Sequence, residues 1–322
     1  MTLLKKIYSL LFVERRLPYT WSENIHNILY KPALDKCLAS VLATKPIPCH
    51  KNTNTELHLV TCKRDIYMAI LAIKSFLRFY SEISVVIHGD ETLDGNCKKE
   101  LSTHIPNVTI IDYDYSMKSV SPEISALREQ IKNRFKLDDS FERQRKAWAL
   151  KVFDFHLFSN TEKIIVLDSD TLFLKKPTEI IDWIKNETVL SFHAQPYLPN
   201  LMFDEGLSHD ILKNKPIIKS FNGGLFGFSK TNIPVSDMFK LAHNLITKTE
   251  IPLFGDECIW RLAYSQVNHQ TLEFNKYPLF GTLSRFKQFK DQTNDFNYIH
   301  FLLKHRHGIY KKFAQSVISE LK

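Results

Sequence analysis

Short apolar runs alternate with amphipathic segments from residue 57 onward. Leu57–Cys62, Ser84–His88 and Val108–Ile111 are apolar runs of the length typical of strands. Between the first two, the segment from Asp65 to about Tyr80 has apolar residues at helical spacing. Strands that alternate with helices in this way are typical of a parallel sheet covered by helices. The pattern therefore predicts an α/β fold with a mostly parallel central sheet.

The middle of the chain continues this alternation. Residues 122–158 are helical in pattern and contain a basic cluster that includes Lys146 and Lys151. Lys163–Leu167 has four apolar residues in a row, which is expected of a central strand that is covered on both faces. Val189–His193 is a further predicted strand. The sheet therefore extends over most of the chain after residue 56.

The first 55 residues differ from the rest, and we expect a helical extension at residues 1–55 and one domain at 56–322. Near its start, apolar residues share one helical face and basic residues surround it: Leu3, Leu4, Ile7, Leu10 and Leu11, with Lys5, Lys6, Arg15 and Arg16. Two interpretations stay open for this segment. The helix packs on the protein's own surface, or residues 1–16 lie on an anionic membrane surface.

Charge and composition exclude several classes of protein. The net charge of +8 is concentrated at the two ends, with +4 in residues 1–50 and +5 in residues 285–322. A nucleic-acid partner is not expected, because such proteins usually carry a basic stripe through the recognition element itself. Five cysteines without a Cys-x-x-Cys pair indicate reduced thiols and a cytoplasmic protein, peripheral at the inner face of a membrane if the helix binds there.

Two carboxylates, Asp168 and Asp170, directly follow the predicted central strand. Functional groups collect at the carboxyl ends of strands in open α/β sheets, and two carboxylates one residue apart can bind one hard cation. A second Asp-x-Asp, Asp112 and Asp114, shows that this spacing also arises by chance. The first pair differs because it follows a longer buried strand and precedes another extended segment. It is therefore the candidate metal site.

Leu167-Asp168-Ser169-Asp170-Thr171-Leu172 resembles the DxD motif of metal-dependent GT-A glycosyltransferases, in particular those of glycosyltransferase family 8. Three further segments resemble the family's motifs and occur in the same order: Asn222-Gly223-Gly224, the acidic helix start Asp256-Glu257, and His300-Phe301. The resemblance extends from about residue 57 to about residue 310. It implies a GT-A type, Rossmann-like fold and an enzyme that moves a sugar from a nucleoside-diphosphate sugar, with a UDP-sugar as the expected donor. The implied acceptor is a glycan, a glycolipid or a protein.

The resemblance also implies roles for individual residues. Asp168, Asp170 and His300 would hold Mn²⁺ or Mg²⁺, a donor set that suits Mn²⁺. The expected nucleotide-sugar contacts are Thr61, Cys62 and Arg64 at the base and ribose, Ser169, Asn222, Gly223 and Gly224 at the sugar, and Lys146, Lys151, Lys304 and Arg306 at the diphosphate. The chain departs from the family after His300, where Leu302-Leu303-Lys304 replaces the usual glycine and Lys-Pro-Trp.

Asp256 and Glu257 are the candidate catalytic acids. One of them accepts the proton of the acceptor hydroxyl if the reaction inverts the anomeric centre. If it retains the configuration, as family 8 enzymes do, these acids position the sugar or the acceptor. The sequence leaves this choice open.

Each of these segments also has a purely structural interpretation. The glycines are compatible with a strand bulge, the two acids with capping of a helix, and Lys151 with a solvated helix face.

Three other functions are weaker alternatives. A haloacid-dehalogenase-type phosphatase needs Asp-x-Asp-x-Thr, but Thr171 comes one residue too early. A sugar nucleotidyltransferase needs a glycine-rich loop after the first strand, where this chain has Cys62-Lys63-Arg64-Asp65. A non-catalytic scaffold is the third alternative.

Overall fold

The computed structural model describes residues 19–51, 54–134, 142–186, 190–194, 211–212, 216–248, 256–280, 283–301 and 309–322. The predicted amphipathic helix at residues 1–16 lies outside these ranges, as do Lys304 and Arg306. Within them, no helix combines the length and the apolar character that crossing a bilayer requires.

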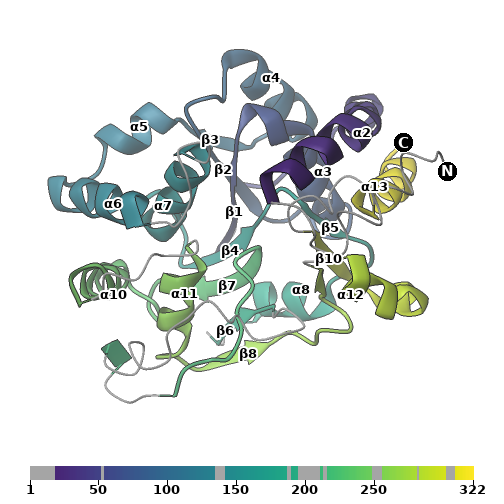
Figure 1. Ribbon diagram of the computed structural model, residues 1–322. Helices are drawn as coiled ribbons and strands as arrows, with labels where there is room; N and C mark the ends of the chain where they lie inside the picture. The colour runs from purple at the N-terminus through teal and green to yellow at the C-terminus, as the bar shows by residue number, and fades with distance from the viewer. Residues whose placement is uncertain are drawn as a thin grey trace.

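A seven-stranded sheet forms the centre of the molecule, with strand order β3-β2-β1-β4-β7-β6-β8 (Figure 1). Strands β3, β2, β1 and β4 are parallel, β7 runs opposite to both of its neighbours, and β8 is parallel to β6. The strands are β1 (Thr55–Thr61), β2 (Ser84–Gly89), β3 (Thr109–Ile111), β4 (Lys163–Leu167), β6 (Ser191–His193), β7 (Leu225–Ser229) and β8 (His269–Thr271). The predicted α/β class with a mostly parallel sheet is confirmed.

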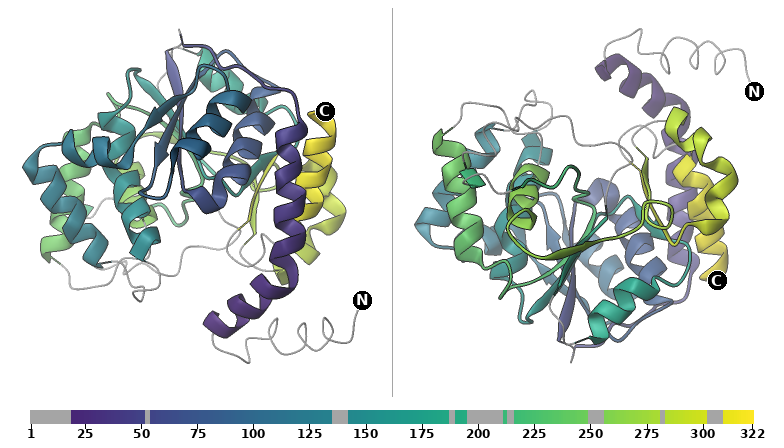
Figure 2. Two further views of the ribbon diagram at one scale, coloured as in Figure 1. Left: turned by 90° about the horizontal axis from the view of Figure 1, so that it is seen from above. Right: turned by 90° about the horizontal axis from the view of Figure 1, so that it is seen from below.

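Helices cover both faces of this sheet, and each face has its own apolar core (Figures 1 and 2). Side chains alternate between the faces along β4: Ile165 and Leu167 join one core, while Ile164 and Val166 join the other. The first face carries α2 (Tyr19–Ala39), α3 (Ile66–Leu77), α4 (Gly95–His104), α8 (Thr178–Lys185) and α13 (Ile309–Glu320). The second carries α6 (Pro122–Arg134), α7 (Glu142–Leu157), α10 (Val235–Lys248) and α11 (Glu257–Tyr264). The prediction that β4 is covered on both faces is therefore confirmed.

Some predicted bounds differ from those of the structure. Strand β1 starts two residues earlier than predicted, at Thr55, whereas β4 has the predicted bounds. The helical pattern at residues 122–158 corresponds to two helices, α6 and α7. The remaining short helical elements are η1 (Ser40–Ala43), η2 (Lys63–Asp65), α5 (Tyr113–Lys118), α12 (Leu283–Gln288) and η4 (Lys290–Asp295).

A second, three-stranded sheet has the order β5-β10-β9, with β5 (Thr171–Phe173), β9 (Leu279–Phe280) and β10 (Tyr298–Phe301). Strand β10 is antiparallel to β5, and its register places His300 opposite Thr171. Because β5 follows the turn after β4, this pairing carries residue 300 to the carboxyl end of the central strand.

The first and the last described helices pack against each other. Helices α2 and α13 are side by side in both views of Figure 2, and the Cys37 thiol lies 3.9 Å from the carbonyl oxygen of Lys311. The helical extension predicted for residues 1–55 thus packs, through α2, against the last helix of the chain.

Candidate active site

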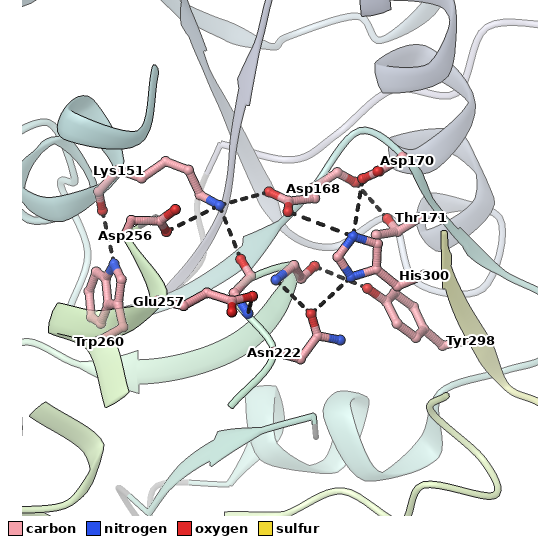
Figure 3. A network of polar contacts seen from close by, with 12 residues as sticks. Lys151, Asp168, Asp170, Thr171, Asn222, Asp256, Glu257, Trp260, Tyr298 and His300 are labelled. Atoms are coloured by element: carbon pink, nitrogen blue, oxygen red, sulfur yellow. Dashed lines mark hydrogen bonds and ion pairs between the residues drawn. The ribbon is translucent and has the colours of Figure 1, made fainter. Parts of the chain in front are cut away.

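Three potential metal ligands converge at the carboxyl end of β4 (Figure 3). Asp168 and Asp170 flank the turn between β4 and β5, and His300 reaches them from β10. The Nε2 atom of His300 lies 3.2 Å from Oδ1 of Asp170 and 3.8 Å from Oδ2 of Asp168. One ligand atom from each residue lies within 4.8 Å of the others. The tertiary structure therefore brings together the two carboxylates predicted from the sequence pattern and the histidine implied by the family resemblance.

Asn222 holds the ring of His300. Its Oδ1 atom accepts a hydrogen bond from the backbone N–H of Gly224 at 2.9 Å, and Nδ1 of His300 lies 2.9 Å from the same oxygen. An amide oxygen can only accept, so Nδ1 carries the proton. In the neutral ring, Nε2 then directs its lone pair toward the two carboxylates. This is the tautomer that a metal-binding histidine needs.

The donor set fits a divalent cation. The Nε2 atom of His300 is buried and has no hydrogen-bond partner among the described residues, although a lone pair there faces two carboxylates. A cation satisfies all three groups at once, and two carboxylates with one imidazole suit Mn²⁺.

Lys151 is the hub of the polar network in Figure 3. Its ammonium group donates to Oδ1 of Asp168 at 2.9 Å and to the carbonyl oxygen of Gly223 at 3.2 Å, and it forms an ion pair with Asp256 at 3.2 Å. Burial alone would lower the pKa of Lys151, but the two carboxylates outweigh burial and the pKa is raised. The lysine is buried, so the alternative of a solvated helix face is wrong.

The two candidate catalytic acids have different surroundings. Asp256 is only 2% exposed and its carboxylate faces Lys151, so it is held inside the network. Glu257 is half-buried at the first turn of α11 and accepts the N–H of Gly223 at 3.1 Å. Burial, followed by the charge of Asp256, raises the pKa of Glu257 to about 7. Glu257 is therefore the more accessible acid of the two.

The residues expected at the base and ribose lie at the end of β1, the sheet neighbour of β4, and directly after it. Arg64 binds the carboxylate of Asp65 with two nitrogens, at 3.0 and 2.9 Å. Burial, together with the charge of Asp65, raises the pKa of Cys62 to about 12, so this thiol stays neutral. The carbonyl oxygen of Thr61 accepts the N–H of Asp90 at 3.0 Å, which joins the loops after β1 and β2.

Lys146 and Ser169, which were also expected to contact the nucleotide sugar, lie in different places. Lys146 forms an ion pair with Glu91, in the loop after β2, at 2.9 Å. Ser169 lies between Asp168 and Asp170 in the sequence, and its side chain is half-buried.

The second Asp-x-Asp pair has a different structural setting. Asp112 precedes the short helix α5, Asp114 lies in its first turn, and Asp112 forms an ion pair with Lys98. Among the described residues, this pair is in no three-ligand group of the kind that Asp168 and Asp170 form with His300.

Two supporting residues were not identified from the sequence. The hydroxyl of Tyr298 donates to the carbonyl oxygen of Gly224 at 3.1 Å, and the indole N–H of Trp260 donates to the carbonyl oxygen of Lys151 at 3.1 Å. Strand alternation puts Tyr298 and His300 on the same face of β10, which is a signal that was available. Trp260 lies one helical turn after Asp256, but the proximity of α11 to α7 is not visible in the local sequence.

Comparison with known proteins supports the fold. No protein-family model and no curated protein matches the sequence. Among solved structures, the galactosyltransferase LgtC in complex with donor and acceptor sugar analogues matches with a TM-score of 0.56 and 13% identity, over 83% of this chain and 96% of that one. An active-site mutant of LgtC matches with a TM-score of 0.53 and 15% identity, over 83% and 96% of the two chains. The bifunctional glycosyltransferase WbbM matches with a TM-score of 0.52 and 13% identity, over 84% of this chain and 50% of that one. The protein has the α/β fold of GT-A glycosyltransferases.

Proposed function

We propose that the protein is a metal-dependent glycosyltransferase that moves a sugar from a nucleoside-diphosphate sugar, with UDP-sugars as the first candidates, to a glycan, glycolipid or protein acceptor. The observation that carries the proposal is the convergence of Asp168, Asp170 and His300 at the carboxyl end of β4, on a fold shared with such enzymes. LgtC, whose fold this chain shares, was solved with donor and acceptor sugar analogues, which supports a sugar-binding role for this protein.

The arrangement suits departure of a nucleoside diphosphate. Asp168, Asp170 and His300 would hold a divalent cation, which would supply positive charge against the negative charge that develops on the leaving group. Asn222 keeps His300 in the metal-binding tautomer, and Lys151 keeps Asp168 in place. Because Lys151 is surrounded by three acceptors, its role here is to organise carboxylates, while Lys146 remains a candidate for direct contact with the diphosphate.

Asp256 and Glu257 have different proposed roles. Asp256 is buried against Lys151 and acts through it, whereas Glu257 is half-buried and is the more exposed of the two acids. Glu257 is therefore the candidate catalytic residue, as a proton acceptor in an inverting reaction or as a positioning group in a retaining one.

The test is release of UDP from a panel of UDP-sugars in added Mn²⁺. We expect Asp168→Asn and Asp170→Asn to lose at least about 100-fold of the wild-type rate, since a metal ion supplies several kcal/mol of charge stabilisation. Asp112→Asn and Asp114→Asn change the other Asp-x-Asp pair and provide a matched control that keeps the wild-type rate. Full activity in the first two variants would refute the proposed metal site.

The membrane role of residues 1–16 is a separate proposal. The predicted apolar helical face, flanked by lysines and arginines in the sequence, supports binding to anionic lipid. Deletion of residues 1–16 should weaken sedimentation with phosphatidylserine vesicles and leave UDP release unchanged. Equal sedimentation of both proteins would exclude this role, and with it a peripheral location at the inner face of a membrane by this route.

A further inference from the structure

The two oxygens of Asp168 have different partners. Oδ1 accepts a hydrogen bond from Lys151 at 2.9 Å, whereas Oδ2 lies on the side of His300, 3.8 Å from its Nε2 atom (Figure 3). The carboxylate is thus held by a cation at one oxygen and faces the other two potential ligands with the second. Only Oδ2 is positioned to join Asp170 and His300 at a common ion.

Lys151 is itself held firmly. Its ammonium group donates hydrogen bonds to Asp168 and to the carbonyl oxygen of Gly223, and it forms an ion pair with Asp256. The side chain is buried, and the indole of Trp260 binds the lysine's own carbonyl oxygen. Moving the ammonium group out of this position would leave the buried carboxylate of Asp256 without its partner, which is costly.

We propose that Lys151 is a positioning residue that restricts Asp168 to one-oxygen binding and thereby makes the site select Mn²⁺ or Mg²⁺ over Ca²⁺. Calcium takes six to eight oxygen ligands and often binds both oxygens of one carboxylate, whereas Mg²⁺ demands a compact octahedral set. With Oδ1 turned toward Lys151, Asp168 presents only Oδ2 to the side of the other two ligands. The inference rests on the proposed function, because it concerns the same metal site.

The experiment compares the dissociation constants of Mn²⁺ and Ca²⁺, each titrated alone into the full-length protein by calorimetry. We expect Lys151→Met to lower the preference for Mn²⁺ over Ca²⁺ by about tenfold or more, the scale seen when partners of metal ligands are changed. The ratio is the decisive quantity. Loss of a positive charge near the site, or partial loss of folding, affects two divalent cations alike and leaves the ratio unchanged.

Three variants serve as controls. Lys151→Arg keeps a donor for Oδ1 of Asp168 and should stay within about twofold of the wild-type ratio, because a guanidinium can hold the same oxygen. Asp256→Asn removes the other carboxylate but leaves the contact between Lys151 and Asp168, so its ratio should also be that of the wild type. The double variant Lys151→Met/Asp256→Asn removes both buried charges, so it avoids the unpaired carboxylate of the single variant and should show the same loss of preference.

The outcomes are distinct. An unchanged ratio in both the single and the double methionine variants, with wild-type circular dichroism in EDTA, overturns the inference. So does a wild-type protein that binds no Mn²⁺. If the ratio changes as expected but no nucleotide sugar is turned over, the proposed transferase function fails while the role of Lys151 stands.

Discussion

Gly224 lies directly against the imidazole ring of His300. A Cβ atom built on this glycine would come within 2.3 Å of Cε1 and 2.5 Å of Nδ1 of the ring, and within 3.1 Å of Oδ2 of Asp168. The backbone of the segment after Asn222 therefore forms one wall of the candidate metal site. A side chain at this position would occupy the space of the ring.

Gly224→Ala should displace His300 and weaken Mn²⁺ binding by at least about tenfold, with an overpacking cost of about 1–3 kcal/mol in the free energy of unfolding. Calorimetric titration with Mn²⁺ and urea denaturation measure the two effects. Gly95→Ala is the matched control, because a Cβ there would meet nothing within 4 Å. Wild-type Mn²⁺ affinity in Gly224→Ala would show that the ring has room to move.

Asn222→Ala should reduce Mn²⁺ affinity by about 10- to 100-fold, because His300 loses the acceptor that fixes its tautomer and orientation. Asn222→Asp keeps an acceptor at the same position and should retain most of the affinity. The same Mn²⁺ titration checks both variants. Equal affinities of the alanine variant and the wild type would contradict this role.

Trp260→Phe should destabilise the protein by about 1 kcal/mol, since it removes the indole hydrogen bond to Lys151 but keeps an aromatic ring. Trp260→Ala should cost about 3–5 kcal/mol because it also leaves a cavity in a fully buried position. Urea denaturation in EDTA gives both values. A phenylalanine variant as unstable as the alanine variant would mean that the hydrogen bond, and not the packing, dominates.

Stability should fall between pH 6.5 and pH 4, in part through His156. Burial lowers the pKa of His156 to about 4, against the opposing hydrogen bond to Ile233, so the unfolded chain binds a proton more readily than the folded one. The contribution of His156 to the free energy of unfolding is fully present above pH 6.5. It falls by about 1.4 kcal/mol per pH unit as the pH drops from 6.5 toward 4.

His156→Gln keeps a donor for the Ile233 carbonyl but cannot titrate, so it should show a shallower loss of stability on acidification. Urea denaturation of both proteins at pH 6.5 and 5.5 measures the slopes. Other buried histidines, including His58 and His193, have pKa values lowered to about 4 and will leave a residual slope in the variant. Identical slopes for the two proteins would exclude a contribution from His156.

The central strand and the carboxylates after it could be predicted from local sequence. A run of apolar residues gives the bounds of β4, and the end of such a strand is where functional groups collect. His300 was identified through the family resemblance alone. Its position depends on the pairing of β10 with β5, which joins segments far apart in sequence and leaves no periodic signal in either one.

The roles of Asn222 and Lys151 could not be predicted in full for the same reason. The sequence placed both at the donor, but their observed contacts are with His300 and with two carboxylates. A buried lysine is recognisable only when its counter-charges are known, and here they come from β4 and from the start of α11. Local patterns report which face of an element is apolar, but they do not report which charged groups the fold brings together.

Strand β10, which carries His300, is synthesised after all the strands of the central sheet. All seven strands of the central sheet precede residue 272, so a ribosome has synthesised them before it reaches His300. A nascent chain can therefore pair its main sheet while the third metal ligand is still missing. The candidate metal site can therefore be completed only after the core that surrounds its carboxylates has been synthesised.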